Sequence, residues 1–228
     1  MMTMKYNQIK GKSRISVLAA VAVLSCSLFT GCVDQSAGNT DKTTEDNSAS
    51  TQSGSVSTML EITDPEEKAA VEAAKAKVKG MGEEPKIIAT SPSTAEICDR
   101  LELDLTGVCS SSVSELPKRY DEVKEVGTAM APDMEIVASL DPDWILSPAT
   151  LQSDLQPKYE AINTDWAFLN LRSVQGMYRS IQELGEIFGR EEQAQTMVDE
   201  FTAFYEDYKN KNEGKDAPKV LILMGLPG

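Results

Sequence analysis

The stretch KIIATSPSTAEICDRLELDLTGV, residues 86–108, decides the fold. It opens with a short apolar run, Ile87–Ala89, and passes through a turn that contains Ser and Pro. A helical pattern over Thr94–Leu101 follows, and a second apolar run, Leu105–Val108, closes the stretch. Apolar runs that alternate with helical patterns are typical of β-α-β units with parallel strands. The stretch therefore predicts an α/β fold with a parallel sheet.

The same alternation continues as far as residue 189. Gly189 is a helix-ending residue, and Asp141-Pro142-Asp143 marks the junction of a helix with a strand. Trp144 and Trp166 lie in strand patterns, so we expect both to be buried. Residues 85–189 are predicted to form one α/β lobe. Its further strands are expected at Trp144–Leu146 and Ala167–Leu169, and its further helices at Met134–Leu140, Leu155–Ile162 and Val174–Phe188.

A long helical pattern without interruption follows the lobe, within residues 190–213. It runs from Arg190 to about Asn210 and would be ~30 Å long at the helical rise per residue. Its apolar side chains recur three and four residues apart, which predicts one buried stripe. The members of this stripe are Met197, Phe201, Phe204, Tyr205 and Tyr208.

The last segment, residues 214–228, contains the fully apolar run Val220–Met224. Such a run is typical of a strand inside a parallel sheet, which needs neighbours on both sides and both faces. We therefore expect this run to open a second α/β lobe whose remainder would follow Gly228.

The first 31 residues have the pattern of a signal peptide. Basic residues precede an apolar or small stretch, Ile15–Phe29, which is too short for the ~20 residues that cross a bilayer as a helix. Leu28–Cys32 resembles the lipobox of bacterial lipoproteins, although Phe29 stands where Leu is usual. The resemblance implies that Cys32 becomes the lipid-modified amino terminus; the alternative is ordinary secretion with a free thiol.

Residues 32–84 are predicted to be a polar tether with a short helix. Val33–Thr58 contains almost no apolar side chains, and this composition cannot compensate the entropy of ordering. Asp64 and Pro65 are typical of a helix start, and the helical pattern continues to Lys79. Because its apolar side chains are mostly alanine, we expect this helix to be loosely attached.

Charge and composition exclude several classes of function. The chain has a net charge of −14, and removal of four basic signal residues leaves 18 Lys and Arg against 36 Asp and Glu, a net of −18. Nucleic acid is therefore not an expected partner. The absence of histidine excludes Ser-His and Cys-His catalysis and the zinc sites built on it. Cys98 and Cys109 are expected to be two buried thiols, with a disulfide left open.

Several motifs resemble the cobalamin, siderophore and haem receptors of ABC importers, in which one rigid helix joins two lobes. The motifs are Ser91–Ile97 with Leu101–Leu103, and Met134–Val137 with Leu140–Asp143. Others are similar to the haem-receptor lipoproteins of the iron-regulated surface determinant system: Ser114–Tyr120, Glu125–Gly127, Met130–Pro132 and Val220–Gly228. The resemblance implies the first lobe of a two-lobe periplasmic-binding-protein-like fold, an interlobe helix and the start of a second lobe.

The resemblance also implies a function and its residues. The chain would belong to a lipid-anchored receptor on the extracellular face of the cytoplasmic membrane, delivering haem to an ABC permease for iron acquisition. Met130 would be an axial ligand of the haem iron, with a histidine beyond Gly228 as the other, so we expect the chain alone to bind haem weakly or not at all. The turn with Ser91, Ser93 and Thr94 would receive a haem propionate, and Glu135 would dock onto permease arginines.

Each of these residues also has a plainer interpretation. Met130 could be a packing residue, Ser91 or Ser93 could simply cap a helix, and Glu135 could be a solvated carboxylate. A siderophore or cobalamin receptor remains the alternative function. Such pockets rely on aromatic and Arg side chains, of which Trp144, Trp166, Tyr120 and Arg119 are present, although burial is the better prediction for both tryptophans. No nucleophile elbow, phosphate loop or metal-spaced cluster points to an enzyme.

Overall fold

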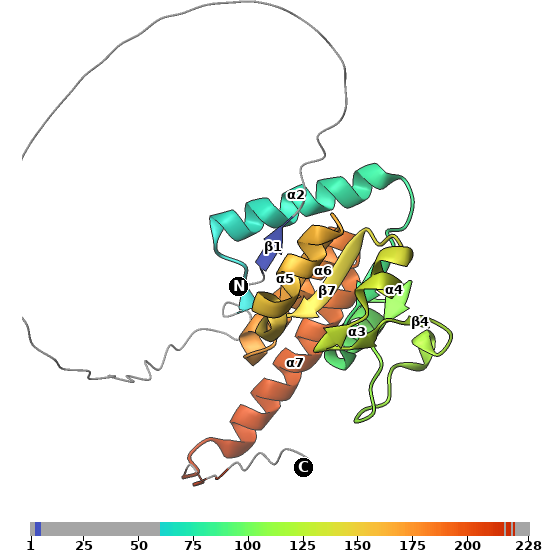
Figure 1. Ribbon diagram of the computed structural model, residues 1–228. Helices are drawn as coiled ribbons and strands as arrows, with labels where there is room; N and C mark the ends of the chain where they lie inside the picture. The colour runs from blue at the N-terminus through green and yellow to red at the C-terminus, as the bar shows by residue number, and fades with distance from the viewer. Residues whose placement is uncertain (1–2, 6–59, 217, 220, 222–228) are drawn as a thin grey trace, which may run out of the picture. The chain divides into compact units, whose positions relative to one another are not determined.

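A six-stranded sheet forms the centre of the fold (Figure 1). This computed structural model describes residues 3–5, 60–216, 218, 219 and 221. The strand order is β1-β8-β7-β2-β3-β4, in which β1 is antiparallel to β8 and the other neighbours are parallel. The parallel sheet confirms the predicted α/β class. The strands are β1 Thr3–Lys5, β2 Ile87–Ala89, β3 Gly107–Val108, β4 Lys124–Glu125, β7 Trp144–Pro148 and β8 Asp165–Leu169.

The predicted helices all form, with shifts of a few residues at their ends. Some have a clear start or stop signal: Asp64 accepts the Glu66 N–H at 2.8 Å at one helix start, and Gly189 ends another helix with φ +66°. The helices are α2 Pro65–Met81, α3 Pro92–Arg100, α4 Met134–Ser139, α5 Gln152–Ala161, α6 Val174–Phe188 and α7 Glu191–Asn212, with 3₁₀ turns η1 Lys118–Tyr120 and η2 Ala149–Leu151.

Helices cover both faces of the sheet. On one face, Ile87 and Ala89 of β2 share a core with side chains from α2, α3, α6 and α7. On the other face, Ile88 shares a core with side chains from α4 and α5. Burial on both faces explains why the strands are continuous apolar runs. Trp144 and Trp166 are both buried, as predicted.

Helix α2 packs firmly on α6, so the expectation of loose attachment was wrong. Val71 and Ala74 lie in the same buried core as Ile181 of α6. Lysines of α2 add ion pairs to other elements: Lys77 pairs with Asp165 at the start of β8, and Lys75 pairs with Glu191 of α7. Alanine provides little apolar area, but it allows two helices to approach closely, and the lysines supply the contacts that the alanines lack.

The predicted stripe of α7 is buried only in its first half. Met197 lies in the core, and Phe201 stacks on Tyr178 with ring centroids 4.6 Å apart. Further along, Phe204 is 67% exposed and Tyr208 is 58% exposed. Figure 1 shows the reason, because the second half of α7 extends beyond the lobe and away from the sheet. Prediction of a fully buried stripe was therefore wrong within the described residues.

Several predictions fall outside the part of the chain that the structure describes. These are the lipidation of Cys32, most of the tether and the strand Val220–Met224, of which only Leu221 is described. Within the expected signal peptide, β1 was not predicted. Of the described helices, none combines the length and the apolar character that crossing a membrane requires.

Candidate functional site

The side of β2 on which the chain adds new strands changes between β4 and β7, so a topological switch point lies between β2 and β7. From β2 the chain continues through α3 to β3 on one side, whereas β7 and β8 lie on the other side. The turn after β2 leads to a helix on one face, and the turn after β7 leads to α5 on the opposite face. In open α/β sheets, ligands bind outside the carboxyl ends of the strands at such a switch point. This edge of the sheet is therefore the candidate site.

Ser91 and Thr94 form a capped turn directly at the switch point. Ser91 is the N-cap of α3, and its Oγ accepts the Thr94 N–H at 3.2 Å. The two hydroxyls also lie 2.7 Å apart in a hydrogen bond, and both residues are buried. Ser93 is exposed. The plainer interpretation, capping, therefore holds for Ser91, while Ser93 is the member of this turn that presents its side chain to the surroundings.

A chain of three buried hydroxyls, which the sequence did not predict, lies beneath this turn. The Thr90 and Ser147 hydroxyls are 2.7 Å apart, and Ser147 is 2.9 Å from the Tyr159 hydroxyl of α5. Burial raises the pKa of Tyr159, although hydrogen bonds with Ser147 and Thr90 partly oppose the increase. These three hydroxyls connect the carboxyl ends of β2 and β7 and hold the base of the candidate site in place.

Met130 lies at the tip of a hairpin on the same edge of the sheet. The hairpin consists of β5, Gly127–Thr128, and β6, Ala131–Pro132, and it follows directly after β4. The Ser110 N–H donates to the Gly127 carbonyl at 2.8 Å, which holds the hairpin beside the carboxyl end of β3. Met130 is 78% exposed. The alternative interpretation, a packing methionine, is contradicted by this exposure.

Gly127 is required by the backbone of this hairpin. Its φ of +93° lies in the region that favours glycine, and a Cβ there would be 2.9 Å from the Ala131 carbonyl oxygen. The Asp133 N–H then donates to the Val126 carbonyl at 2.7 Å, so α4 starts beside the end of β4. One glycine thus determines the geometry from Met130 to the start of the next helix.

Glu135 occupies the first turn of α4 and is exposed. The Asp133 side chain accepts the backbone N–H groups of Glu135 and Ile136 at 3.0 and 3.1 Å, which leaves the Glu135 carboxylate with no capping role there. A carboxylate in the first helical turn is stabilised by the helix dipole. Glu135 is therefore held at the sheet edge on which the hairpin also lies.

The side chains proposed for a siderophore or cobalamin pocket have other roles. Arg119 pairs with Asp104 at 2.7 Å, and the Tyr120 hydroxyl donates to the Leu103 carbonyl at 2.8 Å within the core. Both tryptophans are buried. None of these four side chains extends into the candidate site as an exposed aromatic or basic group.

The two cysteines of the lobe are free thiols, and both are buried. Burial raises the pKa of Cys98 to about 12 and that of Cys109 to about 11. The thiolate is the reactive form of cysteine, so these two residues are structural. Among the described residues there is also no group of three or more His, Cys, Asp or Glu arranged to hold a metal ion.

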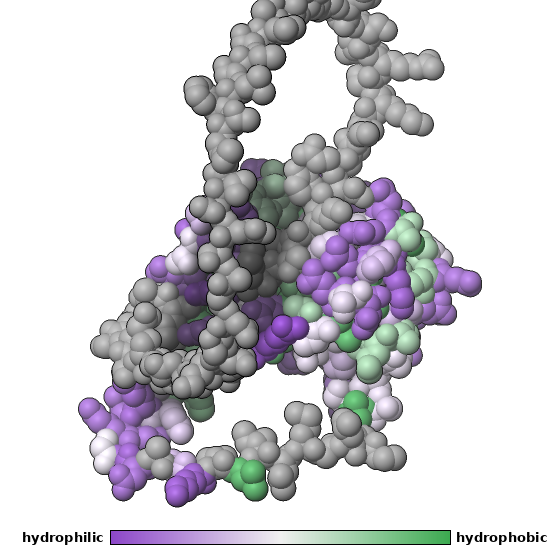
Figure 2. Space-filling view, turned by 60° about the vertical axis from the view of Figure 1, so that its left-hand side comes forward, coloured by the Kyte–Doolittle hydropathy of each residue, from purple (hydrophilic) through white to green (hydrophobic). Residues whose placement is uncertain are grey.

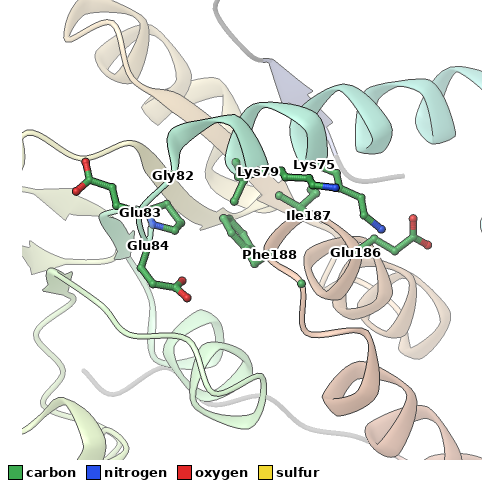
Figure 3. A pocket seen from close by; sticks show the side chains of 11 residues that line it. Lys75, Lys79, Gly82, Glu83, Glu84, Glu186, Ile187 and Phe188 are labelled. Atoms are coloured by element: carbon green, nitrogen blue, oxygen red, sulfur yellow. The ribbon is translucent and has the colours of Figure 1, made fainter.

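The pocket shown in Figure 3 lies away from the predicted site residues. It has a volume of about 490 Å³ and is formed where the end of α2 meets the end of α6, with Lys75 and Lys79 above Ile187 and Phe188. None of the predicted site residues lines it. On the face seen in Figure 2, the described surface is mostly hydrophilic, with hydrophobic residues in small patches, in keeping with the acidic composition.

The family model for periplasmic binding proteins matches residues 87–228. The chain belongs to the periplasmic binding protein family. The match begins at β2, the strand that opens the switch point, and includes every predicted site residue except Cys32. Helix α2 precedes it.

Individual periplasmic binding proteins are similar over the same part. The High-affinity heme uptake system protein IsdE of Staphylococcus aureus, strain Newman, is 37% identical over 144 residues, which are 63% of this chain and 49% of that protein. A crystal structure of S. aureus IsdE complexed with heme has a TM-score of 0.60 at 37% identity and covers 64% of this chain and 57% of that one.

A crystal structure of an ABC transporter substrate-binding protein from Listeria monocytogenes EGD-e is 43% identical with a TM-score of 0.60. The similarity covers 64% of this chain and 56% of that one. This chain spans about half the length of the curated relatives that it matches.

Proposed function

We propose that this chain provides the first haem-binding lobe of an extracellular, lipid-anchored receptor that delivers haem to an ABC importer for iron acquisition. Similarity to IsdE supports haem as the cargo, and similarity to a substrate-binding protein supports the ABC importer. The observation that carries the proposal is the position of Met130, a fully presented thioether at the switch-point edge of the sheet.

A methionine at this place suits haem iron. The thioether is a soft, neutral ligand that haem proteins use on the axial side of the iron. Met130 is 78% exposed, so its sulfur reaches a ligand without any rearrangement of the core. The paired strands on either side of it hold the hairpin, and Gly127 fixes its direction. In this proposal Met130 ligates the iron from the side of the lobe.

The turn at the start of α3 provides the second contact in this proposal. Helix starts carry unpaired N–H groups and a partial positive charge, which favour anions. Ser91 and Thr94 are engaged with each other, so a haem propionate would contact the exposed Ser93 and the backbone of the turn. The hydroxyl chain of Thr90, Ser147 and Tyr159 keeps this turn in place below the ligand.

Titration of haem into the chain, followed in the Soret region, tests the role of Met130. Imidazole is added at no more than one equivalent per haem as the second axial ligand, because the chain contains no histidine and an excess would occupy both axial positions. Met130→Leu should weaken haem binding roughly tenfold, which is about 1.4 kcal/mol. It should also remove the spectral signature of thioether-ligated ferric haem.

Met134→Leu is the matched control, since Met134 is a partly exposed methionine at the start of α4. It should leave both the affinity and the spectrum unchanged. Equal haem binding by the wild type and Met130→Leu would contradict the proposal. Binding of cobalamin or of a ferric siderophore in place of haem would favour the alternative receptor classes.

Two further parts of the proposal have their own measurements. Glu135→Arg should reduce haem uptake by cells that carry the permease without changing haem affinity. Glu122→Arg, a change at another exposed acid of this lobe, should not reduce uptake. Unchanged uptake in Glu135→Arg would contradict permease docking.

Cys32→Ser should abolish the incorporation of a labelled fatty acid. Incorporation that persists in Cys32→Ser would contradict lipidation at this residue.

A further inference from the structure

Two acidic side chains meet in the contact between α2 and α6. Glu67 continues the buried stripe of α2, because it lies four and seven residues before Val71 and Ala74 on one face of the helix. It is only 6% exposed. Glu183 lies on the buried face of α6 and is 0% exposed. The helices therefore place two carboxyl groups where apolar side chains would be expected.

The surroundings of Glu183 favour its neutral form. Within the described residues, neither of its carboxyl oxygens has a hydrogen-bond partner of ordinary geometry. Burial, followed by the neighbouring Glu67, raises the pKa of Glu183 from 4.5 to about 9. Two carboxylates at close range cannot both be charged in a poorly solvated place. At neutral pH Glu183 therefore carries a proton.

The other charged groups near the pair do not replace this proton. Glu186, one turn further along α6, also raises the pKa of Glu183. The two lysines of α2 that form ion pairs are directed to other partners, Lys75 to Glu191 and Lys77 to Asp165. The other charged residues of the two helices are Glu66, Lys68, Glu72 and Lys79 on α2, and Arg179 on α6, one turn before Glu183.

We propose that Glu67 and Glu183 form a proton-dependent latch, which holds α2 against α6 and loosens as the surroundings become more alkaline. This inference is independent of the haem proposal, because the latch lies outside the candidate site and involves a helix that precedes the family match. The proton on the latch controls whether the 17 residues of α2 stay packed on α6. Detached, these residues would lengthen the connection to the lobe by ~25 Å if they stayed helical.

The direction of the pH dependence follows from the raised pKa. When α2 is detached, water reaches Glu183 and its pKa returns to the ordinary value near 4.5. Docking is then strongest below pH 4.5, weakens as the pH rises, and loses the whole contribution of the proton once the pH exceeds about 9. Between these limits the docking constant should fall about tenfold for each pH unit.

Hydrogen exchange of the full chain at pH 6 and pH 8 tests the latch. After correction for intrinsic exchange rates, the protection of α2 amides should fall roughly 100-fold between these values, while α3 amides keep their protection and serve as the internal reference. In Glu183→Gln, which keeps the shape of the side chain without its charge, the protection of α2 should change by less than about threefold, within the scatter of such measurements.

Three variants complete the test. Glu186→Gln, the matched control on the same helix, should keep the steep pH dependence. Lys77→Met should lower the protection of α2 at both pH values by the same factor, because it weakens docking without removing the latch. If Glu183→Gln does not fold, Glu67→Gln should show a shallower dependence than the wild type. The latch is overturned by pH-independent protection in the wild type, by an equal slope in Glu183→Gln, or by parallel loss in α3.

Discussion

The carboxyl edge of the sheet and the α2–α6 contact use polar groups in opposite ways. At the edge, buried hydroxyls satisfy one another, and the groups that we assign to ligand binding, Met130 and Ser93, are exposed. In the α2–α6 contact the ionisable groups themselves are buried, as Glu67 and Glu183 show. A neutral hydroxyl chain supports a site without responding to pH, whereas buried carboxyl groups make packing depend on their charge.

Breaking the ion pair beneath α2 should have the largest effect on stability. Asp165 has a side chain only 2% exposed, and Lys77 is its ion-pair partner. Lys77→Met removes the positive charge beside this buried carboxylate, so the free energy of unfolding should fall by about 3 kcal/mol. Urea unfolding measures the change. Lys79→Met, an exposed neighbour, should change stability by less than about 0.5 kcal/mol; equal effects would contradict the contrast drawn above.

A change at Gly127 should have an intermediate effect, located at the carboxyl edge. Gly127→Ala forces a Cβ against the Ala131 carbonyl at a positive φ, which should cost about 2 kcal/mol in unfolding free energy. The same substitution at Gly80 meets nothing within 4 Å and should stabilise α2 by about 0.5 kcal/mol. Thermal unfolding of both variants measures the two effects, one in the hairpin and one in α2. A neutral Gly127→Ala would show that the hairpin backbone is not fixed.

The smallest expected change comes from the hydroxyl chain. Tyr159→Phe removes the hydroxyl that lies 2.9 Å from Ser147 and should lower the unfolding free energy by about 1 kcal/mol. Tyr208→Phe, on the exposed part of α7, should stay within about 0.5 kcal/mol of the wild type. Because these three hydroxyls are uncharged, the loss of stability in Tyr159→Phe should be equal at pH 6 and pH 8. A loss that differs between the two pH values would contradict a neutral floor.

The elements that the sequence predicted well are those in which local pattern and burial agree. Ile87–Ala89 is apolar and buried on both faces, and Asp64, Ser91 and Gly189 carry helix-end chemistry that depends on nearest neighbours alone. The resemblance assigned several candidate residues to one cleft; in the structure Ser91, Ser93 and Thr94 follow β2 and Met130 lies after β4, whereas Glu135 follows the antiparallel strand β6. The family match and the parallel sheet confirm the predicted fold class, and the roles of the candidate residues stay predictions.

The elements that were missed depend on contacts between distant residues. The hairpin around Met130 lacks the Asn-Gly or Asp-Gly turn that marks a two-residue loop, and β4 has only two residues, both exposed. The hydroxyl chain joins three elements, so no local spacing reveals it. Alanine in α2 suggested weak packing because the partners of Lys75 and Lys77 lie 116 and 88 residues away. The spacing of the apolar stripe on α7 was predicted correctly, but its second half is exposed because α7 extends beyond the lobe.

Under the proposed function, the hairpin between Gly127 and Pro132 separates ligand contact from the core of the lobe. None of the four residues from Thr128 to Ala131 is buried, so none of them has a duty in the core. Other side chains at these positions would change the exposed surface, while the three buried hydroxyls and both cores keep their contacts. If the hairpin contacts ligand as proposed, substitutions within it should alter ligand preference without loss of the fold, provided that Gly127 is kept.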